Sequence, residues 1–269
     1  MLDRLVLRNV WVSSWVLSLS HFGDALIYVI LPVHADAFGV SMLMVGFLLA
    51  VNRIIRTFAY GLIVELAERI GVKNLCLIAA VTATLSTAGY GWFDGAVLLT
   101  LSRMVWGLSF AALLLVTLTY AAVNPAKTGT RIGLSRSVEQ VGPLLAMTVG
   151  AWLATIVGPR DIFLYLSLAT AVSVMLAFGL DASAQPARIK KPVARDRIFP
   201  RPDSLGMLIF WAWAGIDGVF SVPMSVIVAF RASRLAKRSR PPGSNEARLR
   251  PSTAPIPRGQ IRCRDSSRG

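Results

Sequence analysis

Long apolar segments, separated by short polar loops, run through the first 180 residues of the chain. A helix that crosses a bilayer needs about 20 mostly apolar residues. We predict six such helices, at residues 10–33, 42–63, 75–93, 96–123, 141–157 and 162–180. The pattern is typical of an all-α integral membrane protein, with residues 1–180 forming a six-helix bundle.

The pattern changes after residue 180. Residues 181–204 are polar and basic, with four prolines, and predict a cytoplasmic linker. Residues 205–230 form a seventh apolar segment. Residues 231–269 are rich in Arg, Pro and Ser without apolar periodicity, which predicts disorder. The abrupt change after Phe230 is what a truncation or a frame shift would produce in a longer apolar protein. The alternative is a genuine basic tail that binds anionic lipid.

Composition supports the membrane assignment. The chain is 55% hydrophobic, and its formal net charge is +14. Eleven Lys or Arg and two acids fall in the last 39 residues, so nine of the fourteen net positive charges lie in the tail. This distribution argues against a nucleic-acid-binding surface on the apolar part of the chain. The two cysteines have no metal-ligand or disulfide spacing.

Loop charges predict the orientation, because positive residues favour the cytoplasmic side. Basic residues precede the first segment, and the connections after the second, fourth and sixth segments also contain basic residues. These residues are Arg4, Arg8, Arg69, Lys73, Lys127, Arg131 and Arg136, together with six in the linker. The alternate loops carry only Arg160. We therefore expect a multi-pass protein of the inner (plasma) membrane with a cytoplasmic N-terminus.

The loop after the second segment carries a recognisable motif. It reads LAERIGVK from residue 66 to residue 73. This loop resembles the G-x-x-x-D-R-x-G-R-[KR] signature of the major facilitator superfamily, which it matches at Glu68, Arg69, Gly71 and Lys73. It departs from the signature at Val64 and Val72. The chain resembles this family of transporters from residue 1 to about residue 230. The resemblance implies that this loop helps to control the inward/outward transition.

Two further motifs support the resemblance. Arg103 and Gly107 match the R-x-x-x-G pattern of the fourth helix in that family, where the arginine is tied to proton coupling. Gly142 and Pro143 match a Gly-Pro helix-packing element in the fifth helix. In antiporters paired glycines follow this element, whereas Ala146 and the next residue, a methionine, stand here.

Charged residues in the middle of apolar segments are the candidate substrate and proton-coupling site. Asp24, Arg53 and Asp217 lie near the middle of their segments, and Arg103 lies in the outer third of its own. The segments around Asp24 and Asp217 are similar, as internal repeats in transporters are. We expect Asp24 and Arg53 to pair, either as a site that responds to protons and anions or as a purely structural lock between adjacent helices.

Other polar and aromatic residues have more ordinary interpretations. We expect Arg56, three residues after Arg53, to extend towards the cytoplasmic end of its helix, and His21 to be a satisfied polar group. Glu139 and Arg136 are expected to form an ion pair at the membrane interface. Trp106 is grouped with the other tryptophans as an interfacial anchor.

The sequence thus predicts a secondary transporter of a small solute that works by alternating access, coupled to protons. The paired arginines favour an anionic solute, because guanidinium groups bind carboxylate and phosphate bidentately. No nucleotide-binding loop, metal cluster or serine elbow indicates an enzyme or a cofactor. Two alternatives are consistent with the pattern: a remnant that inserts but transports nothing, and a half-transporter that acts as a homodimer.

Overall fold

Residues 2–181 are described by the computed structural model, and they are built from helices without strands. The elements are α1 (Leu2–Val33), a 3₁₀ turn (Ala35–Phe38), α2 (Met42–Ile70), α3 (Val72–Trp92), α4 (Ala96–Ala121), a second 3₁₀ turn (Pro125–Lys127), α5 (Thr128–Leu145), a π-helical turn (Ala146–Gly150), α6 (Ala151–Val157) and α7 (Asp161–Phe178). Together they provide six segments long and apolar enough to cross a membrane. The predicted all-α membrane fold is confirmed. Residues 182–269 lie outside the described residues. They include the rest of the predicted linker, the seventh segment with Asp217, and the tail.

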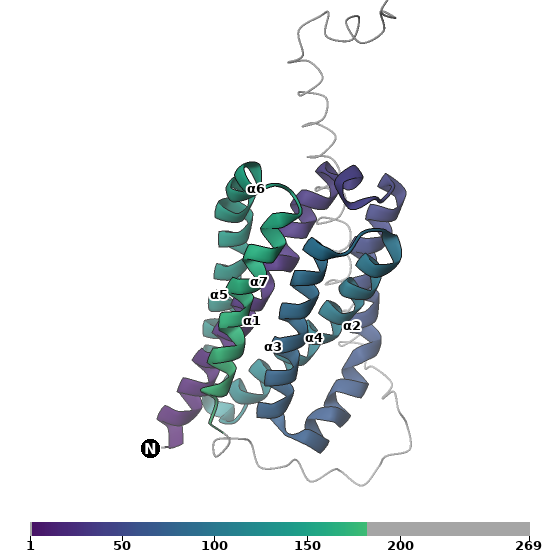
Figure 1. Cartoon of the computed structure of the whole chain (residues 1–269). Helices are drawn as coiled ribbons and strands as arrows, with labels where there is room; N and C mark the ends of the chain where they lie inside the picture. Colours follow the sequence, from purple (N-terminus) through teal and green to yellow (C-terminus); the bar gives the residue numbers. More distant parts are fainter. Residues whose placement is uncertain (1, 182–269) are drawn as a thin grey trace, which may run out of the picture. The chain divides into compact units, whose positions relative to one another are not determined.

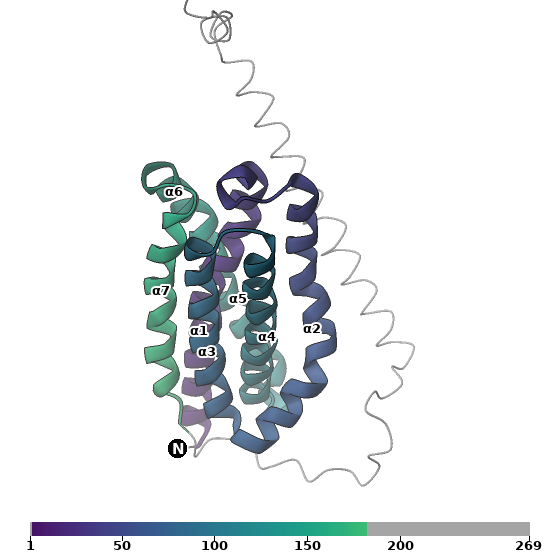
Figure 2. The ribbon, with the colours of Figure 1, turned by 45° about the vertical axis from the view of Figure 1, so that its right-hand side comes forward.

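The first helix lies at the centre of the bundle. α1 packs against α4, α5 and α7, while α3 packs against α4 and α7, and α2 packs mainly against α4 (Figure 1, Figure 2). α1 is the most buried of the six spans, with 72% of its apolar window inside the bundle. Polar groups on α1 are therefore surrounded by protein on most sides.

The fifth span is longer than the sequence predicts. α5 begins at Thr128. Together with the preceding 3₁₀ turn, the π-helical turn and α6 it forms one span of 33 residues, Pro125–Val157. The prediction that it begins at residue 141 is wrong. Residues 128–140 are mostly polar, but Arg131, Ser135 and Glu139 among them are buried. A hydropathy pattern does not detect a helix turn whose polar residues are buried against protein.

α5 and α1 approach closely at Gly142. The backbone N–H of Gly142 donates to Ser18 Oγ at 2.9 Å. A β-carbon at position 142 would overlap the backbone carbonyl of Ser18. Farther along, a β-carbon at Gly150 would lie 3.4 Å from Leu26. Gly142 with Ser18 and Gly150 with Leu26 are both 124 positions apart, so α5 and α1 run parallel and in register.

The start of α1 is also tied to the bundle. Asn9 pairs with the backbone of Asp181, donating to its carbonyl at 2.9 Å and accepting from its N–H at 3.1 Å. Asp3 forms ion pairs with Lys127 at 3.0 Å and with Arg131 at 3.2 Å. These contacts join the start of α1 to the end of α7 and to the start of the fifth span.

The contact at Gly142 gives a first prediction. Gly142→Ala is expected to destabilise the folded bundle by about 1–3 kcal/mol, because the methyl group meets a backbone oxygen that cannot rotate away. Thermal unfolding of the purified protein in detergent measures the change. Gly133→Ala is the matched control, because position 133 lies on the same helix and no atom lies within 4 Å of the added carbon. Equal stability of the two variants would contradict the close approach.

Candidate functional site

The carboxylate of Asp24 is the centre of a buried polar cluster formed by α1, α2 and α4. Asp24 is 6% exposed. Its Oδ1 accepts a short, charge-assisted hydrogen bond from Arg103 Nη1 on α4 and a 3.2 Å hydrogen bond from Asn52 Nδ2 on α2. A single carboxylate oxygen therefore joins three helices.

Arg103 is held rigidly in this cluster. Its side chain is fully buried, and its Nε donates to the carbonyl of Leu48 at 3.2 Å. Its guanidinium lies 5.0 Å from the ring centre of Tyr28 and 5.9 Å from that of Tyr90. A cation buried to this extent needs its counter-ion, because uncompensated charge is costly away from water.

Arg56 lies on the other side of the same carboxylate and is held less tightly. Its Nη2 lies 3.8 Å from Asp24 Oδ2, which is too long for a hydrogen bond. Its Nε donates to Asn52 Oδ1 at 3.0 Å. The guanidinium stacks on aromatic rings, 3.7 Å from the centre of Phe110 and 4.9 Å from that of Trp106. The side chain keeps 19% of its surface accessible.

The aromatic rings beside Arg56 form a stack between α1 and α4. His21 stacks on Phe110 with ring centres 4.6 Å apart and on Trp106 at 5.3 Å. Trp106 and Phe110 stack on each other at 5.4 Å. Within residues 2–181, His21 Nδ1, Trp106 Nε1 and Arg103 Nη2 are buried polar atoms without a hydrogen-bond partner.

The charges in this cluster do not cancel. Asp24 supplies one negative charge, while Arg56 and Arg103 supply two positive charges. The cluster can therefore attract an anion, and Arg56 is the cation with accessible surface and the weaker contact to Asp24.

The structure changes the predicted pairing of Asp24. The ion pairs of Asp24 within residues 2–181 are with Arg103 and Arg56, so the expected Asp24–Arg53 pair is wrong. Arg53 lies with its guanidinium 5.7 Å from the ring centre of Tyr28, at the edge of the same cluster. Arg56 was expected to extend towards the cytoplasmic end of its helix. Instead it points into the bundle, towards Asp24 and Phe110.

Asn52, Arg56 and Trp106 are site residues that sequence reasoning did not identify. Asn52 and Arg56 are four residues apart, so they share one face of α2, whereas Arg53 is rotated by about 100° from Asn52. Trp106 is 1% exposed within the bundle rather than at the membrane interface. Arg103, Trp106 and Phe110 are three and four residues apart, so they share one face of α4. This spacing could have indicated that Trp106 lies beside Arg103 inside the bundle.

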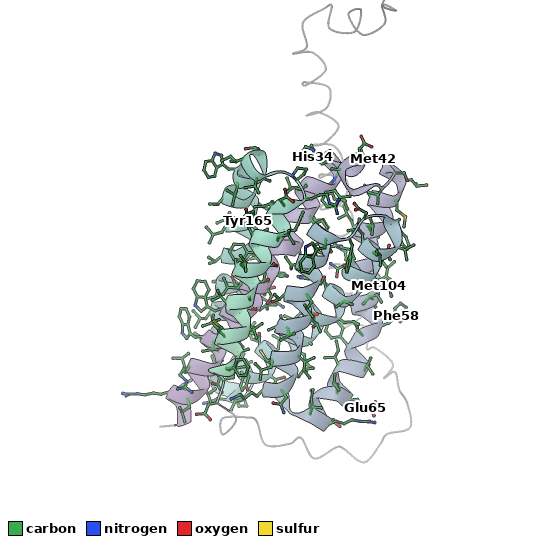
Figure 3. All side chains as sticks on the ribbon, in the orientation of Figure 1. His34, Met42, Phe58, Glu65, Met104 and Tyr165 are labelled. Carbon is green, nitrogen blue, oxygen red and sulfur yellow. The ribbon has the colours of Figure 1, made fainter. Side chains whose placement is uncertain are left out.

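The loop motif lies far from this cluster, at the end of the bundle that holds the N-terminus. Glu65 marks this end, opposite His34 and Met42 (Figure 3). Gly71 ends α2 and starts α3 with a φ of 87°, a conformation that favours glycine. Arg69 pairs with Glu65 at 2.8 Å, while Glu68 and Lys73 are partly exposed. The chain therefore reverses sharply at Gly71.

Comparison with known proteins identifies the family. The model of the Major Facilitator Superfamily matches residues 14–255. The chain belongs to the Major Facilitator Superfamily. The match extends past Phe230, where the sequence predicts that the resemblance ends. A search of curated proteins found no match to the chain.

Membership of the Major Facilitator Superfamily makes the chain a multi-pass membrane protein of a transporter family, and this family is not enzymatic in general. In residues 2–181, no group of three or more His, Cys, Asp or Glu side chains is placed to hold a metal ion. The polar cluster around Asp24 is accordingly the candidate site for solute and proton binding.

The buried ion pair gives a second prediction. Arg103→Met is expected to lower the free energy of unfolding by about 3 kcal/mol or more, because Asp24 loses its closest counter-ion. Adding Asp24→Asn to Arg103→Met should recover much of that loss, because the double variant has no uncompensated carboxylate. Denaturant titration in detergent of the parent protein, the two single variants and the double variant measures the coupling free energy between Asp24 and Arg103. Additive losses would show that the two side chains do not depend on each other.

Proposed function

We propose that the chain takes part in proton-coupled secondary transport of a small anionic solute by alternating access. The contacts of Asp24 support this proposal. One buried carboxylate is shared by a rigid cation, Arg103, and by a more accessible cation, Arg56. In a membrane helix, such charges are functional by default, because they are costly to bury.

The coupling of proton and anion follows from electrostatics. With Asp24 ionised, the Asp24–Arg56–Arg103 cluster carries one net positive charge, and protonation of Asp24 raises this to two. An anion therefore binds more tightly to the protonated cluster. By linkage, the bound anion favours protonation of Asp24 to the same extent. The proposal consequently predicts movement of proton and anion in the same direction.

Arg56 is the proposed anion ligand. Its 3.8 Å contact with Asp24 is easily exchanged, while its stacking on Phe110 and its hydrogen bond to Asn52 keep the guanidinium oriented. A guanidinium held by one face and by Nε still offers its remaining N–H groups to carboxylate or phosphate. Glu68, Arg69, Gly71 and Lys73 are proposed to control the transition between the inward-open and outward-open states, as the family resemblance implies.

Replacement of Asp24 tests the proposal. Asp24→Asn is expected to abolish uptake driven by a pH gradient, because the amide cannot carry the proton, while exchange of anion across the membrane persists. The measurement is uptake and counterflow in proteoliposomes, with labelled inorganic phosphate and a panel of labelled small carboxylates. Asp161→Asn is the matched control, because Asp161 is an exposed carboxylate at the start of α7.

The outcomes separate the alternatives. Gradient-driven uptake by Asp24→Asn equal to that of the parent protein would contradict the assignment of Asp24. If the parent protein inserts but moves no anion at all, the chain is not an active transporter on its own. Restoration of uptake by a covalently linked second copy, and not by added single copies, would then identify a half-transporter.

We also propose that the N-terminus is cytoplasmic in the inner (plasma) membrane, from the basic loops. In a variant without its two cysteines, Asp94→Cys is expected to react with a membrane-impermeant maleimide in intact cells. Asn74→Cys should react only after permeabilisation, because the two positions lie at opposite ends of α3. Labelling of position 74 in intact cells would reverse the orientation.

A further inference from the structure

A second carboxylate is buried deep in the membrane-spanning bundle. Glu139 on α5 is 3% exposed. The sequence predicts an interfacial ion pair here, but α5 begins eleven residues earlier, so Glu139 lies about three turns inside the helix. Its ion-pair partner in the described part is Arg136, whose Nη1 donates to Glu139 Oε2 at 2.7 Å. The predicted ion pair is confirmed, and it lies inside α5 rather than at the start of the span.

The register of α1 and α5 places Glu139 relative to Asp24. Gly142 lies against Ser18 on the parallel helix α1, so Glu139 lies at the level of position 15. Asp24 is nine residues farther along α1. At a rise of 1.5 Å per residue, the two carboxylates are separated by about 14 Å along the bundle axis. By this register, Glu139 lies between Asp24 and the end of the bundle where α1 begins.

The two partners of this ion pair differ in exposure. The side chain of Glu139 is 4% exposed, whereas that of Arg136 is 39% exposed. Arg136 can therefore leave the pair for a more solvated position, and the carboxylate cannot follow. A buried carboxylate that loses its cation has to take up a proton, because the ionised form is strongly disfavoured without a partner.

The groups around Glu139 connect it to the Asp24 cluster. His21 of α1 lies within electrostatic range of Asp24, Arg56 and Arg136. Tyr60 of α2 lies within range of Arg56, Arg136 and Glu139. The third neighbouring helix, α4, has no titratable side chain between positions 103 and 120 and contributes Trp106 and Phe110 to this level.

A purely structural ion pair is the simplest alternative. However, the residues of such a pair contribute little to stability relative to apolar side chains of similar volume, and this holds especially when they must be desolvated. Ionisable side chains within membrane spans instead mark the paths of ions and protons. Asp24 and Glu139 are two buried carboxylates at two depths of the same bundle, each paired with an arginine that keeps accessible surface.

We propose that Glu139 is a second proton-binding site, on the N-terminal side of the Asp24 cluster. A proton adds to the Glu139 carboxylate, giving a neutral carboxylic acid, and the Arg136 guanidinium is released as a free cation. Loss of the proton restores the carboxylate and the ion pair. This site extends the proposed function, since it receives or supplies the proton that Asp24 carries, but protonation of Glu139 itself requires no transport.

Chemical modification of the unaltered full chain tests this proposal. Dicyclohexylcarbodiimide is apolar and reacts with protonated carboxyl groups, so it reports buried carboxylic acids in proteoliposomes. We expect Glu139 to be modified several-fold more at acid than at alkaline pH, as measured by peptide mapping in a mass spectrometer. The same map reports Asp24 separately, so failure of one site is distinguishable from failure of the other.

Arg136→Gln provides the second variant. Without the Arg136 guanidinium, Glu139 loses its ion-pair partner in the described part of the chain, so the protonated form is favoured. Modification of Glu139 should therefore increase several-fold over that of the parent protein at the same pH. Arg160→Gln is the matched control, because Arg160 pairs with the exposed Asp94 in a loop at the other end of the bundle, and Glu139 modification should not change. Absence of modification at Glu139 at every pH, in both the parent protein and Arg136→Gln, would overturn the proposal.

Discussion

The ion pair between Asp24 and Arg103 is the interaction on which the interior of this bundle depends. It joins α1, the most buried helix, to α4, and Asn52 adds α2 to the same oxygen. In a bilayer, neither charge has water as an alternative partner, so each helix is fixed by the other two. The aromatic stack of His21, Trp106 and Phe110 and the guanidinium of Arg56 are arranged around this junction.

The same junction sets the chemistry of the site. Arg103 is fully buried and hydrogen-bonded to a backbone carbonyl, so it acts as a fixed charge. Arg56 is partly accessible and lies 3.8 Å from Asp24, too far for a hydrogen bond, which is why we propose it as the anion ligand. The proposed coupling of proton and anion rests on this sharing of one carboxylate between a fixed and a more accessible cation. The proposal for Glu139 places a second buried carboxylate at another depth, paired with one cation, Arg136.

Much of the fold was predictable from hydropathy, and the reasons for the exceptions are physical. Six spans and the all-α class follow from runs of apolar residues, since lipid requires an apolar surface. The start of α5 was missed because Arg131 and Glu139 are buried by α1 and other protein groups rather than by lipid. Asp24 and Arg103 stood out as charges within apolar segments. Which residue of α2 meets Asp24 depends on helix rotation, and single-sequence periodicity did not decide between Arg53 and Arg56.

The central claim is that a proton and an anion bind together at the Asp24 cluster. The most direct test is the internal pH of proteoliposomes that contain the full chain and a trapped pH-sensitive dye. On addition of a transported anion outside, the lumen should acidify in step with anion entry, and Asp24→Asn should lose both. Anion entry without any change of internal pH would contradict it.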